Sequence, residues 1–470
     1  MIKAMREKVL NMRKKLRLAC AVAAAMLFAS GCTAASQKKA RKEKMEKIMN
    51  YSAEELSLFD EYLTFSAGAT CEWYKDGTAE KSIGSARVPD MCALPDDPSL
   101  KDAKYIRTSA YISFESDGNQ HLSVEGPRFY EITVTYNEVH TEPYSEDTFF
   151  KANVFYKVNI AYVYKEGMQP VFHADSGYKL SVYAPSFGGV PSTPLARISD
   201  EHLRDPFIML DRGGKYYMTG TYDPKDWKNT KEIHIYRSDD LAEWEDLGAV
   251  WNYEKDATWQ KELITDGSSP IWAPELHYVK GNYYICYSLG WGLMGGAVLR
   301  STTGIPEGPY EDICTKPVFD TIDATLFVDD DGKVYAIWGD GLIAEMDADM
   351  TGMKTAPKAL MSESGKRVGF EGCYVLKIGG LYYLCSATYC YHFKEDGTPY
   401  QTYDSFYAIS DNLFGPYSER RLLLKYGGHN NLFFDKEGKL FTTAFYGPDF
   451  SERPAIAELT VTDEGLLKVK

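Results

Sequence analysis

A short pattern recurs five times within residues 197–470 and constrains the fold more than any other feature. Each copy combines an apolar strand, a turn with glycine and an aromatic strand, which is typical of a β-hairpin. The copies are GGKYYMTGT, KGNYYICYS, DGKVYAIWG, GGLYYLCSA and EGKLFTTAF, with turn glycines at Gly214, Gly281, Gly332, Gly380 and Gly438. Their spacing of 48 to 67 residues leaves room for about four strands per copy, as in propeller blades. The sequence therefore predicts an all-β fold with a five-bladed β-propeller over residues 197–470.

One position of this repeat carries chemically reactive residues. Nine residues before the five turn glycines stand Asp205, Trp272, Asp323, Glu371 and His429. The first strand of a propeller blade lines the central channel, so residues at equal phase should meet at one mouth of the channel. Carboxylates held close together raise one another's pKa values, and proteins keep such arrangements mainly at functional sites. We therefore expect an active site there, rather than acids that cap turns or pair with basic residues.

Three converging carboxylates suit the cleavage of a glycosidic bond. That reaction needs one carboxyl group as proton donor and a second as base or nucleophile. The third could orient the donor and raise its pKa. A ring of acids with a histidine could instead bind a cation, although hard metal ions need several oxygens at one point. The sequence contains no Cys/His cluster with zinc-ligand spacing and no Gly-x-Ser-x-Gly motif.

The motifs around these positions resemble glycoside hydrolase family 43. The resemblance runs from Arg197 to the carboxyl end and is carried by RDPFIML, WAPELHYVKGNYYICYS, IDATLFVDDDGKVYAIWG, FEGCYVLKIGGLYYLCSA and GGHNNLFFDKEGKLF. It implies a five-bladed propeller that hydrolyses arabinose- or xylose-containing glycans with inversion and requires no cofactor. The family often has proline where this chain has Ala324 and Cys373, but the three acids are intact.

The resemblance also implies a role for each residue of the site. Asp205 corresponds to the general base, Glu371 to the general acid, and Asp323 to the residue that orients the acid and raises its pKa. Trp272 resembles part of the wall of the sugar pocket, and Arg204 is also expected to bind the substrate. Glu275 is grouped with them, but its position three residues past the repeat position, lower in the channel, favours a hydrogen-bonding residue or an ion contact. His429 resembles the family's axial histidine, which often lies beside a calcium or sodium ion.

The first 31 residues resemble a bacterial lipoprotein signal. A basic stretch ends at Arg17, residues 18–28 are apolar, and Ala-Ser-Gly precedes Cys32. Cys32 would then be the lipidated first residue of a protein anchored to the membrane of the cell envelope, outside the cytoplasm. A plain secretory signal is the alternative. Residues 32–50 are rich in lysine with interspersed glutamate and are interpreted as a tether.

Residues 51–185 predict a smaller β-rich accessory domain with one short helix. Ser52 and Glu55 form a capping box before an apolar-periodic run. Strands are expected in the alternating stretches 104–114, 129–136, 149–164 and 178–184. A segment rich in proline and glycine at 185–194 marks the boundary. The role of this domain stays open between a glycan-binding module and a spacer or packing partner.

Charge and composition exclude some partners and leave two other functions open. A net charge of −15 argues against nucleic-acid binding, which needs a basic surface, whereas neutral polysaccharides or oligosaccharides remain suitable partners. The chain could be a glycan-binding surface propeller without turnover. It could also be another five-bladed glycan enzyme, such as a fructan hydrolase or a phosphorylase. Phosphorolysis would require a basic cluster, but only Arg204 and Arg300 stand near the motifs. Cys71 and Cys92 could pair, and nothing in the sequence fixes an oligomeric state.

Overall fold

The computed structural model describes residues 34–78, 80–136, 140–185, 196–222, 230–265, 271–290, 295–445 and 453–470. The predicted signal with Cys32, and nearly all of the predicted boundary segment, lie outside these residues. The chain divides into two compact units, residues 1–50 and residues 51–470. In the first unit, helix α2 (Ala34–Met49) covers most of the segment interpreted as a tether. Alanine, lysine and glutamate are strong helix formers, which explains the helix. None of the helices in the described part of the chain has both the length and the apolar character of a membrane span.

The second unit begins with helix α3 (Ala53–Ser66), whose start has the predicted capping box. The Glu55 N–H donates to the Ser52 hydroxyl, and the Ser52 N–H donates to the Glu55 carboxylate. An antiparallel sheet follows in the order β2-β1-β3-β9-β6-β7, with β11 also paired to β3. Its strands are β1 (Ala69–Tyr74), β2 (Gly84–Val88), β3 (Tyr105–Phe114), β6 (Tyr130–Tyr136), β7 (His140–Pro143), β9 (Tyr156–Val163) and β11 (Tyr178–Ser181). We call residues 51–185 the N-terminal β region.

Several strands of this region agree with the sequence, and others were missed. The predicted stretches correspond to β3, β6, β9 and β11. Along β3, Ile106, Thr108, Ala110 and Ile112 are buried while the residues between them are partly exposed, which is the period-2 pattern of a strand with one face on a core. Strands β1 and β2 were not predicted. The shorter elements are η1 (Pro98–Asp102), β4 (Gly118–Asn119), β5 (Ser123–Glu125), β8 (Phe149–Phe150) and β10 (Val171–His173).

The C-terminal region, residues 196–470, consists mainly of antiparallel sheets that follow one another along the chain. The first sheet contains β13 (Leu203–Leu210), β14 (Tyr216–Tyr222), β15 (Glu232–Ser238) and β16 (Glu245–Asn252); the second contains β17 (Ile271–Val279), β18 (Asn282–Leu289), β19 (Gly296–Ser301) and β20 (Tyr310–Asp312). The third contains β21 (Thr325–Val328), β22 (Val334–Trp338), β23 (Leu342–Glu345) and β24 (Lys358–Ala359); the fourth contains β25 (Glu371–Ile378), β26 (Leu381–Phe393), β27 (Pro399–Ser410) and β28 (Arg421–Leu424). Short helices α4 (Tyr253–Asp256) and α5 (Gln260–Leu263) follow the first sheet.

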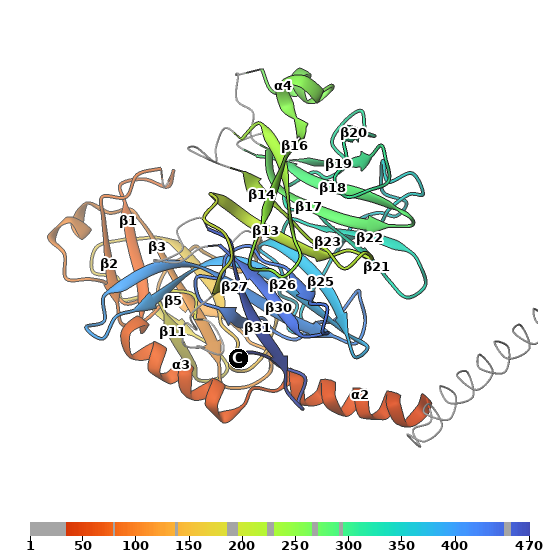
Figure 1. The fold of residues 1–470 in the computed structure, drawn as a ribbon. Coiled ribbons are helices and arrows are strands. Elements are labelled where there is room, and N and C mark those ends of the chain that lie inside the picture. The colour runs from red at the N-terminus through yellow and green to blue at the C-terminus, as the bar shows by residue number, and fades with distance from the viewer. Residues whose placement is uncertain are drawn as a thin grey trace, which may run out of the picture. The chain divides into compact units, whose positions relative to one another are not determined.

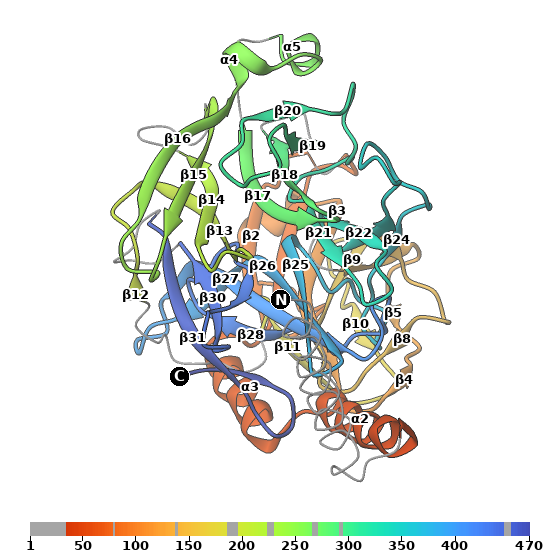
Figure 2. The same ribbon diagram turned by 45° about the vertical axis from the view of Figure 1, so that its right-hand side comes forward.

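The fifth sheet combines strands from both ends of the C-terminal region. Its order is β12 (Ala196–Arg197), β31 (Ala455–Val461), β30 (Leu440–Ala444) and β29 (Leu432–Phe434), with β32 (Leu467–Val469) also paired to β31. Each predicted hairpin supplies the first two strands of one sheet. The first strands also contact one another in a cycle, from β13 to β17, β21, β25 and β29 and back to β13. Figure 2 shows β13, β17, β21 and β25 near the middle of these sheets, with the last strands β16, β20 and β24 farther out.

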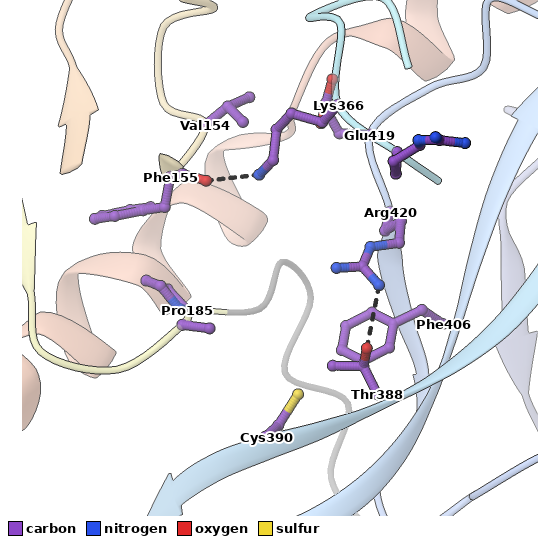
Figure 3. Close-up of a pocket in the computed structure, with 11 residues that line it drawn as sticks. Val154, Phe155, Pro185, Lys366, Thr388, Cys390, Phe406, Glu419 and Arg420 are labelled. Carbon is purple, nitrogen blue, oxygen red and sulfur yellow. Dashed lines mark hydrogen bonds between the residues drawn. The ribbon is translucent and has the colours of Figure 1, made fainter. Parts of the chain in front are cut away.

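Polar contacts join the N-terminal β region to the fourth sheet. The Arg421 guanidinium lies 2.8 Å from the Glu55 carboxylate, and both side chains are largely buried. A cavity of about 60 Å³ lies nearby (Figure 3), where Lys366 donates to the Phe155 carbonyl over 2.6 Å. These contacts explain why residues 51–470 form one compact unit, although among the described residues no strand pairing joins the two regions.

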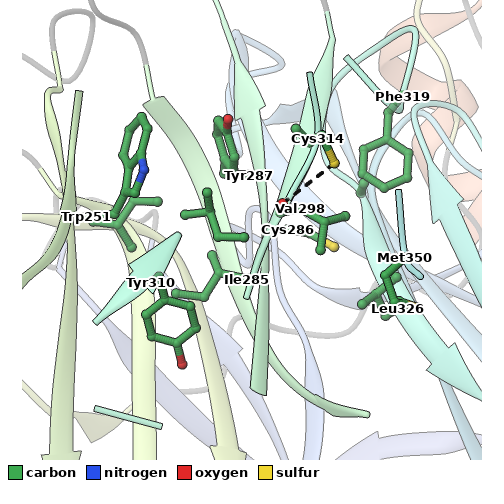
Figure 4. Packing of buried hydrophobic residues seen from close by; sticks show 14 of the residues in the cluster. Trp251, Ile285, Cys286, Tyr287, Val298, Tyr310, Cys314, Phe319, Leu326 and Met350 are labelled. Atoms are coloured by element: carbon green, nitrogen blue, oxygen red, sulfur yellow. Dashed lines mark hydrogen bonds between the residues drawn. The ribbon is translucent and has the colours of Figure 1, made fainter. Parts of the chain in front are cut away.

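The largest apolar cluster of the C-terminal region extends from the first sheet into the third. Figure 4 shows part of it, including Trp251, Cys286 and Phe319. Cys286 and Cys385 each stand five residues after the turn glycine of their hairpins, and both are fully buried, so they fill equivalent packing positions. All seven cysteines that the structure describes are free thiols, so Cys71 and Cys92 are not paired.

Candidate active site

The five residues that stand nine positions before the turn glycines lie near or just before the start of the first strand of each sheet. Arg204 and Asp205 are in β13, Trp272 and Glu275 are in β17, and Glu371 begins β25. Asp323 and His429 stand two and three residues before β21 and β29. The cycle of contacts among these strands brings the side chains together from five sheets.

The first strands are irregular where these residues stand. Strand pairing shifts between Arg204 and Phe207 in β13, between Trp272 and Glu275 in β17, and between Glu371 and Tyr374 in β25. A shift of this kind turns a side chain away from the regular alternation of a strand, and such bulges are common beside active sites. Repeated bulges therefore allow several sheets to direct polar residues towards one place.

The backbone is also strained at the bulges of β13 and β17 and at Asp323, before β21. Asp205 has φ 51°, Ala273 φ 43° and Asp323 φ 60°, all in the left-handed region. A non-glycine residue in a sparsely populated conformation costs on the order of 1–3 kcal/mol and persists only where its surroundings hold it. Two of these three residues are the acids that the sequence singled out.

His429 is the residue around which the carboxylates gather. Its Nδ1 lies 3.7 Å from Asp205 Oδ1 and 3.8 Å from Asp323 Oδ2, and its Nε2 lies 3.6 Å from Glu275 Oε1. Burial acts to lower the pKa of His429, but the neighbouring carboxylates, Asp323 foremost, outweigh it and raise the pKa to about 10. The ring is therefore an imidazolium at neutral pH, and it offsets negative charge in the cluster.

Glu275 belongs to the cluster directly. Its second oxygen accepts a hydrogen bond from His277 Nε2 over 3.1 Å. Burial acts to raise the pKa of Glu275, but the interactions with His277 and His429 outweigh it and leave the pKa below its ordinary value. Glu275 is therefore a buried carboxylate between the imidazole rings of His277 and His429.

Asp323 is fixed by backbone and hydroxyl groups. Its N–H donates to the Ser288 hydroxyl over 2.8 Å, and its Oδ2 accepts from the Gly372 N–H over 3.1 Å. Burial raises the pKa of Asp323 to about 7, opposed by His429 and reinforced by the other carboxylates. From the sequence we expected mutual repulsion of the carboxylates to raise their pKa values. In the structure, burial is the larger cause for Asp323. Because Gly372 follows Glu371, the Asp323 carboxyl contacts the backbone beside Glu371.

Glu371 and Asp205 each have a hydroxyl partner that the sequence argument missed. Tyr403 donates to Glu371 Oε1 over 2.7 Å, and Thr221 donates to Asp205 Oδ2 over 2.6 Å. The Thr221 hydroxyl in turn accepts from the Ala273 N–H over 2.8 Å. Burial raises the pKa of Glu371 against the Tyr403 hydrogen bond, so this carboxyl group keeps its proton to higher pH than an exposed glutamate.

The two remaining residues of the predicted site lie at its edge. A Cβ atom on Gly290 would lie 2.0 Å from the Trp272 ring, so the absence of a side chain at Gly290 lets the half-buried indole pack against the backbone. The Arg204 guanidinium lies 4.7 Å from the centroid of the Phe445 ring. Its charge acts to lower the pKa of Glu371, so Arg204 faces the cluster.

The resemblance predicts a calcium or sodium ion beside His429, and this stays a prediction. Both nitrogens of the ring face carboxylates, whose oxygens are the kind of ligand that calcium binds. Across the parts of the chain that the structure describes, no group of three or more His, Cys, Asp and Glu side chains is placed to hold a metal ion.

Comparison with known proteins identifies relatives of the C-terminal region. The profile of glycosyl hydrolases family 43 matches residues 197–446, more than half of the chain. A β-D-galactofuranosidase of Aspergillus niger is 28% identical over 47% of this chain and 66% of its own length; a xylan 1,3-β-xylosidase of a Vibrio species is 30% identical over 45% and 40%. An extracellular exo-α-(1→5)-L-arabinofuranosidase of Cellvibrio japonicus is 24% identical over 46% of this chain and 67% of its own length. The chain thus spans less than two thirds of the first two relatives.

Proposed function

The chain belongs to glycosyl hydrolases family 43, and we infer that it hydrolyses glycans that contain arabinose, xylose or galactofuranose. The relatives named above act on these sugars, and the family model covers the region that carries the carboxylate cluster. The single observation that carries the proposal is the convergence of Asp205, Asp323 and Glu275 on one buried histidine beside the Glu371 backbone. The finer proposal for the fold is a closed five-bladed propeller, supported by the cycle of contacts among first strands.

In the proposed mechanism, Glu371 donates a proton to the leaving oxygen and Asp205 accepts one from the attacking water. The raised pKa of Glu371, caused by burial, favours the protonated form that a donor needs. Thr221 holds one oxygen of Asp205 and leaves the other available to a water. Attack by water on the face opposite the leaving group inverts the anomeric configuration, for which the two carboxyl groups must lie about 6.5–9.5 Å apart.

The other residues position the reacting groups and the sugar. Asp323 orients Glu371 through the Gly372 N–H, and His429 offsets the charge of the carboxylates around it. Trp272 and Arg204 contact the sugar, while Glu275 supports His429. No step requires a cofactor. We further propose that Cys32 carries a lipid that anchors the protein to the cell envelope, where polysaccharides are accessible.

The experiment compares two substrates that differ in how much the leaving group needs a proton. Glu371→Gln keeps the shape of the side chain but cannot donate, so hydrolysis of a natural glycan should fall about 10²–10⁴-fold. An aryl glycoside with an acidic phenol should suffer much less. Asp205→Asn removes the base and should slow both substrates to a similar extent. The matched control is Glu311→Gln, which removes an exposed carboxylate from a surface ion pair with Arg300.

Four outcomes would contradict parts of the proposal. Equal slowing of both substrates by Glu371→Gln would contradict its role as acid. A product that NMR detects first in the retained anomeric form would contradict inversion. Wild-type protein that binds glycans but releases no sugar would be a glycan-binding protein, and sugar phosphate released only with inorganic phosphate would indicate a phosphorylase.

A further inference from the structure

The fourth sheet has an extension that begins beside the proposed acid. Strand β26 pairs with β25 only as far as Ala387, which stands opposite Glu371. Beyond that point β26 and β27 continue as a two-stranded hairpin, from the pair Thr388–Asp404 to the pair Phe393–Pro399. Figure 1 shows these two long strands reaching from the C-terminal sheets towards the N-terminal β region. The hairpin therefore leads away from the cluster on the Glu371 side.

One face of this hairpin presents tyrosine rings to solvent. Tyr389 is 44% exposed and Tyr391 is 37% exposed, whereas Cys390 between them is buried. Residues two apart on a strand share a face and lie roughly 6.5–7 Å apart. The Tyr389 ring stacks on Tyr403 with centroids 4.5 Å apart, and Tyr403 donates to Glu371. The aromatic face is thus continuous with the site through one ring.

The N-terminal β region fixes the far end of this face. Tyr183 stacks on Tyr391 with centroids 4.6 Å apart, and the Tyr62 hydroxyl donates to the Tyr391 carbonyl over 3.4 Å. Phe393 packs against Tyr62, Phe65 and Tyr183, with centroid distances of 5.1, 5.8 and 5.7 Å. Rings held in this way lose little conformational freedom when a ligand binds.

Exposed aromatic side chains that lie next to one another mark binding surfaces on soluble proteins. The C–H faces of sugar rings stack on aromatic rings without needing charged partners, and tyrosine adds a hydroxyl that can form hydrogen bonds. Phe393, at the hairpin end, is covered by three rings and serves packing. Tyr389 and Tyr391 leave much of their surface exposed to solvent. This exposed surface is not used in packing.

We propose that Tyr389, Tyr391 and Tyr183 form a platform that binds a neutral glycan chain on the leaving-group side of the bond to be cleaved. The side follows from the proposed function, on which this inference rests: the acid lies next to the leaving oxygen, and the platform continues outward from the acid. The N-terminal β region then contributes to substrate binding, through Tyr183 and through the contacts that hold the hairpin.

The test separates binding of a long chain from the chemical step. Wild-type protein and the variants Tyr389→Ala and Tyr391→Ala are assayed on debranched arabinan, on arabinoxylan and on 4-nitrophenyl α-L-arabinofuranoside. Each variant should raise KM for the hydrolysed polymer about 2- to 10-fold, the usual effect of losing one aromatic contact. The kcat on the polymer and both constants for the aryl glycoside should change little, because the aryl group does not reach the platform.

Control variants distinguish a loss of folding from a loss of glycan binding. Tyr391→Phe keeps the ring and should keep the wild-type KM, while Phe129→Ala removes a 65% exposed ring of the N-terminal β region that is outside the platform. Thermal melts accompany every variant. Unchanged KM for the polymer in both tyrosine-to-alanine variants would overturn the platform, and so would an equal rise of KM for the aryl glycoside.

A second measurement does not depend on turnover. Affinity electrophoresis of Glu371→Gln protein through gels containing each polysaccharide should show retardation that Tyr391→Ala weakens and Phe129→Ala does not. If the wild type hydrolyses nothing but is retarded through these tyrosines, the proposed function fails and the platform stands. If the wild type hydrolyses the polymers and the tyrosines affect neither KM nor retardation, the platform fails and the proposed function stands.

Discussion

Gly372→Ala should disturb the site more than the small size of the added methyl group suggests, because the structure leaves no room for a methyl group at this position. A Cβ atom on Gly372 would lie 2.7 Å from Cδ2 and 2.8 Å from Cγ of His429. Ordinary van der Waals contact begins at 3.4 Å, so the ring would have to move by about 0.7 Å. His429 is buried and faces carboxylates through both nitrogens, so such a movement disturbs Asp205, Asp323 and Glu275 together.

The expected loss of stability in Gly372→Ala has two causes, backbone strain and overpacking, and a second glycine of the chain allows us to separate them. Gly372 has φ 60°, and alanine in the left-handed conformation costs roughly 1–2 kcal/mol. Overpacking against the ring adds about 1–3 kcal/mol. Gly332 has φ 76°, and a Cβ there meets nothing within 4 Å. Gly332→Ala therefore carries the first part alone and is the matched control.

Thermal melts and kcat/KM on an aryl glycoside measure the difference. We expect Gly372→Ala to lose about 1–3 kcal/mol more stability than Gly332→Ala. It should also lose activity by roughly 10²-fold, because displacement of a catalytic group by about 1 Å costs that much. In a His429→Ala background the two alanine substitutions should cost equal stability. Equal melting temperatures and full activity of both variants in the wild-type background would refute the reasoning.

Four further results are expected. Burial raises the pKa of Asp323 to about 7, so between about pH 4 and 7 the folded protein binds a proton that the unfolded chain has lost. Stability should therefore fall as pH rises from about 4 to 7. Asp323→Asn should flatten this fall in the melting temperature. Tyr403→Phe removes a hydrogen bond to the ionised acid, so the pKa of Glu371 rises and the alkaline limb of the pH–activity profile should move to higher pH; an unmoved limb would argue against Glu371 as donor. Dialysis against EDTA should leave activity intact, because no step of the proposed mechanism uses a metal ion; loss restored by calcium would contradict this. Cys32→Ala should move the protein from the membrane fraction to the soluble fraction, and a variant that still needs detergent would exclude the lipid anchor.

The sequence identified the positions of the site because the repeat fixes where a residue stands along its own strand. The same offset from five turn glycines selected Asp205, Asp323, Glu371 and His429, whose side chains or neighbouring backbone meet in the structure. The capping box of α3 was also predictable, since it depends on residues three apart. Local patterns of this kind do not depend on how sheets lie against one another.

The partners of those residues could not be predicted, because they come from other strands at unrelated offsets. Thr221 is in the second strand of the first sheet and Tyr403 in the third strand of the fourth. Neither occupies the repeat position that carries the acids, so only the packing of the sheets pairs them with Asp205 and Glu371. Ser288, near the end of β18, likewise gave no signal that its hydroxyl would accept from the Asp323 N–H.

The arrangement of charges explains why the cluster can be buried at all. Asp205, Asp323 and Glu275 would be costly together in a low-dielectric interior, and removing each from water raises the cost further. An imidazolium within 4 Å of all three lowers that cost, and each carboxylate in turn favours the charged ring. Glu371 has its shortest side-chain hydrogen bond with the neutral Tyr403 instead, so burial is the main influence on it and its pKa rises. Burial thus keeps a proton on Glu371 to higher pH than on an exposed glutamate, which suits the proton donor that inverting hydrolysis requires.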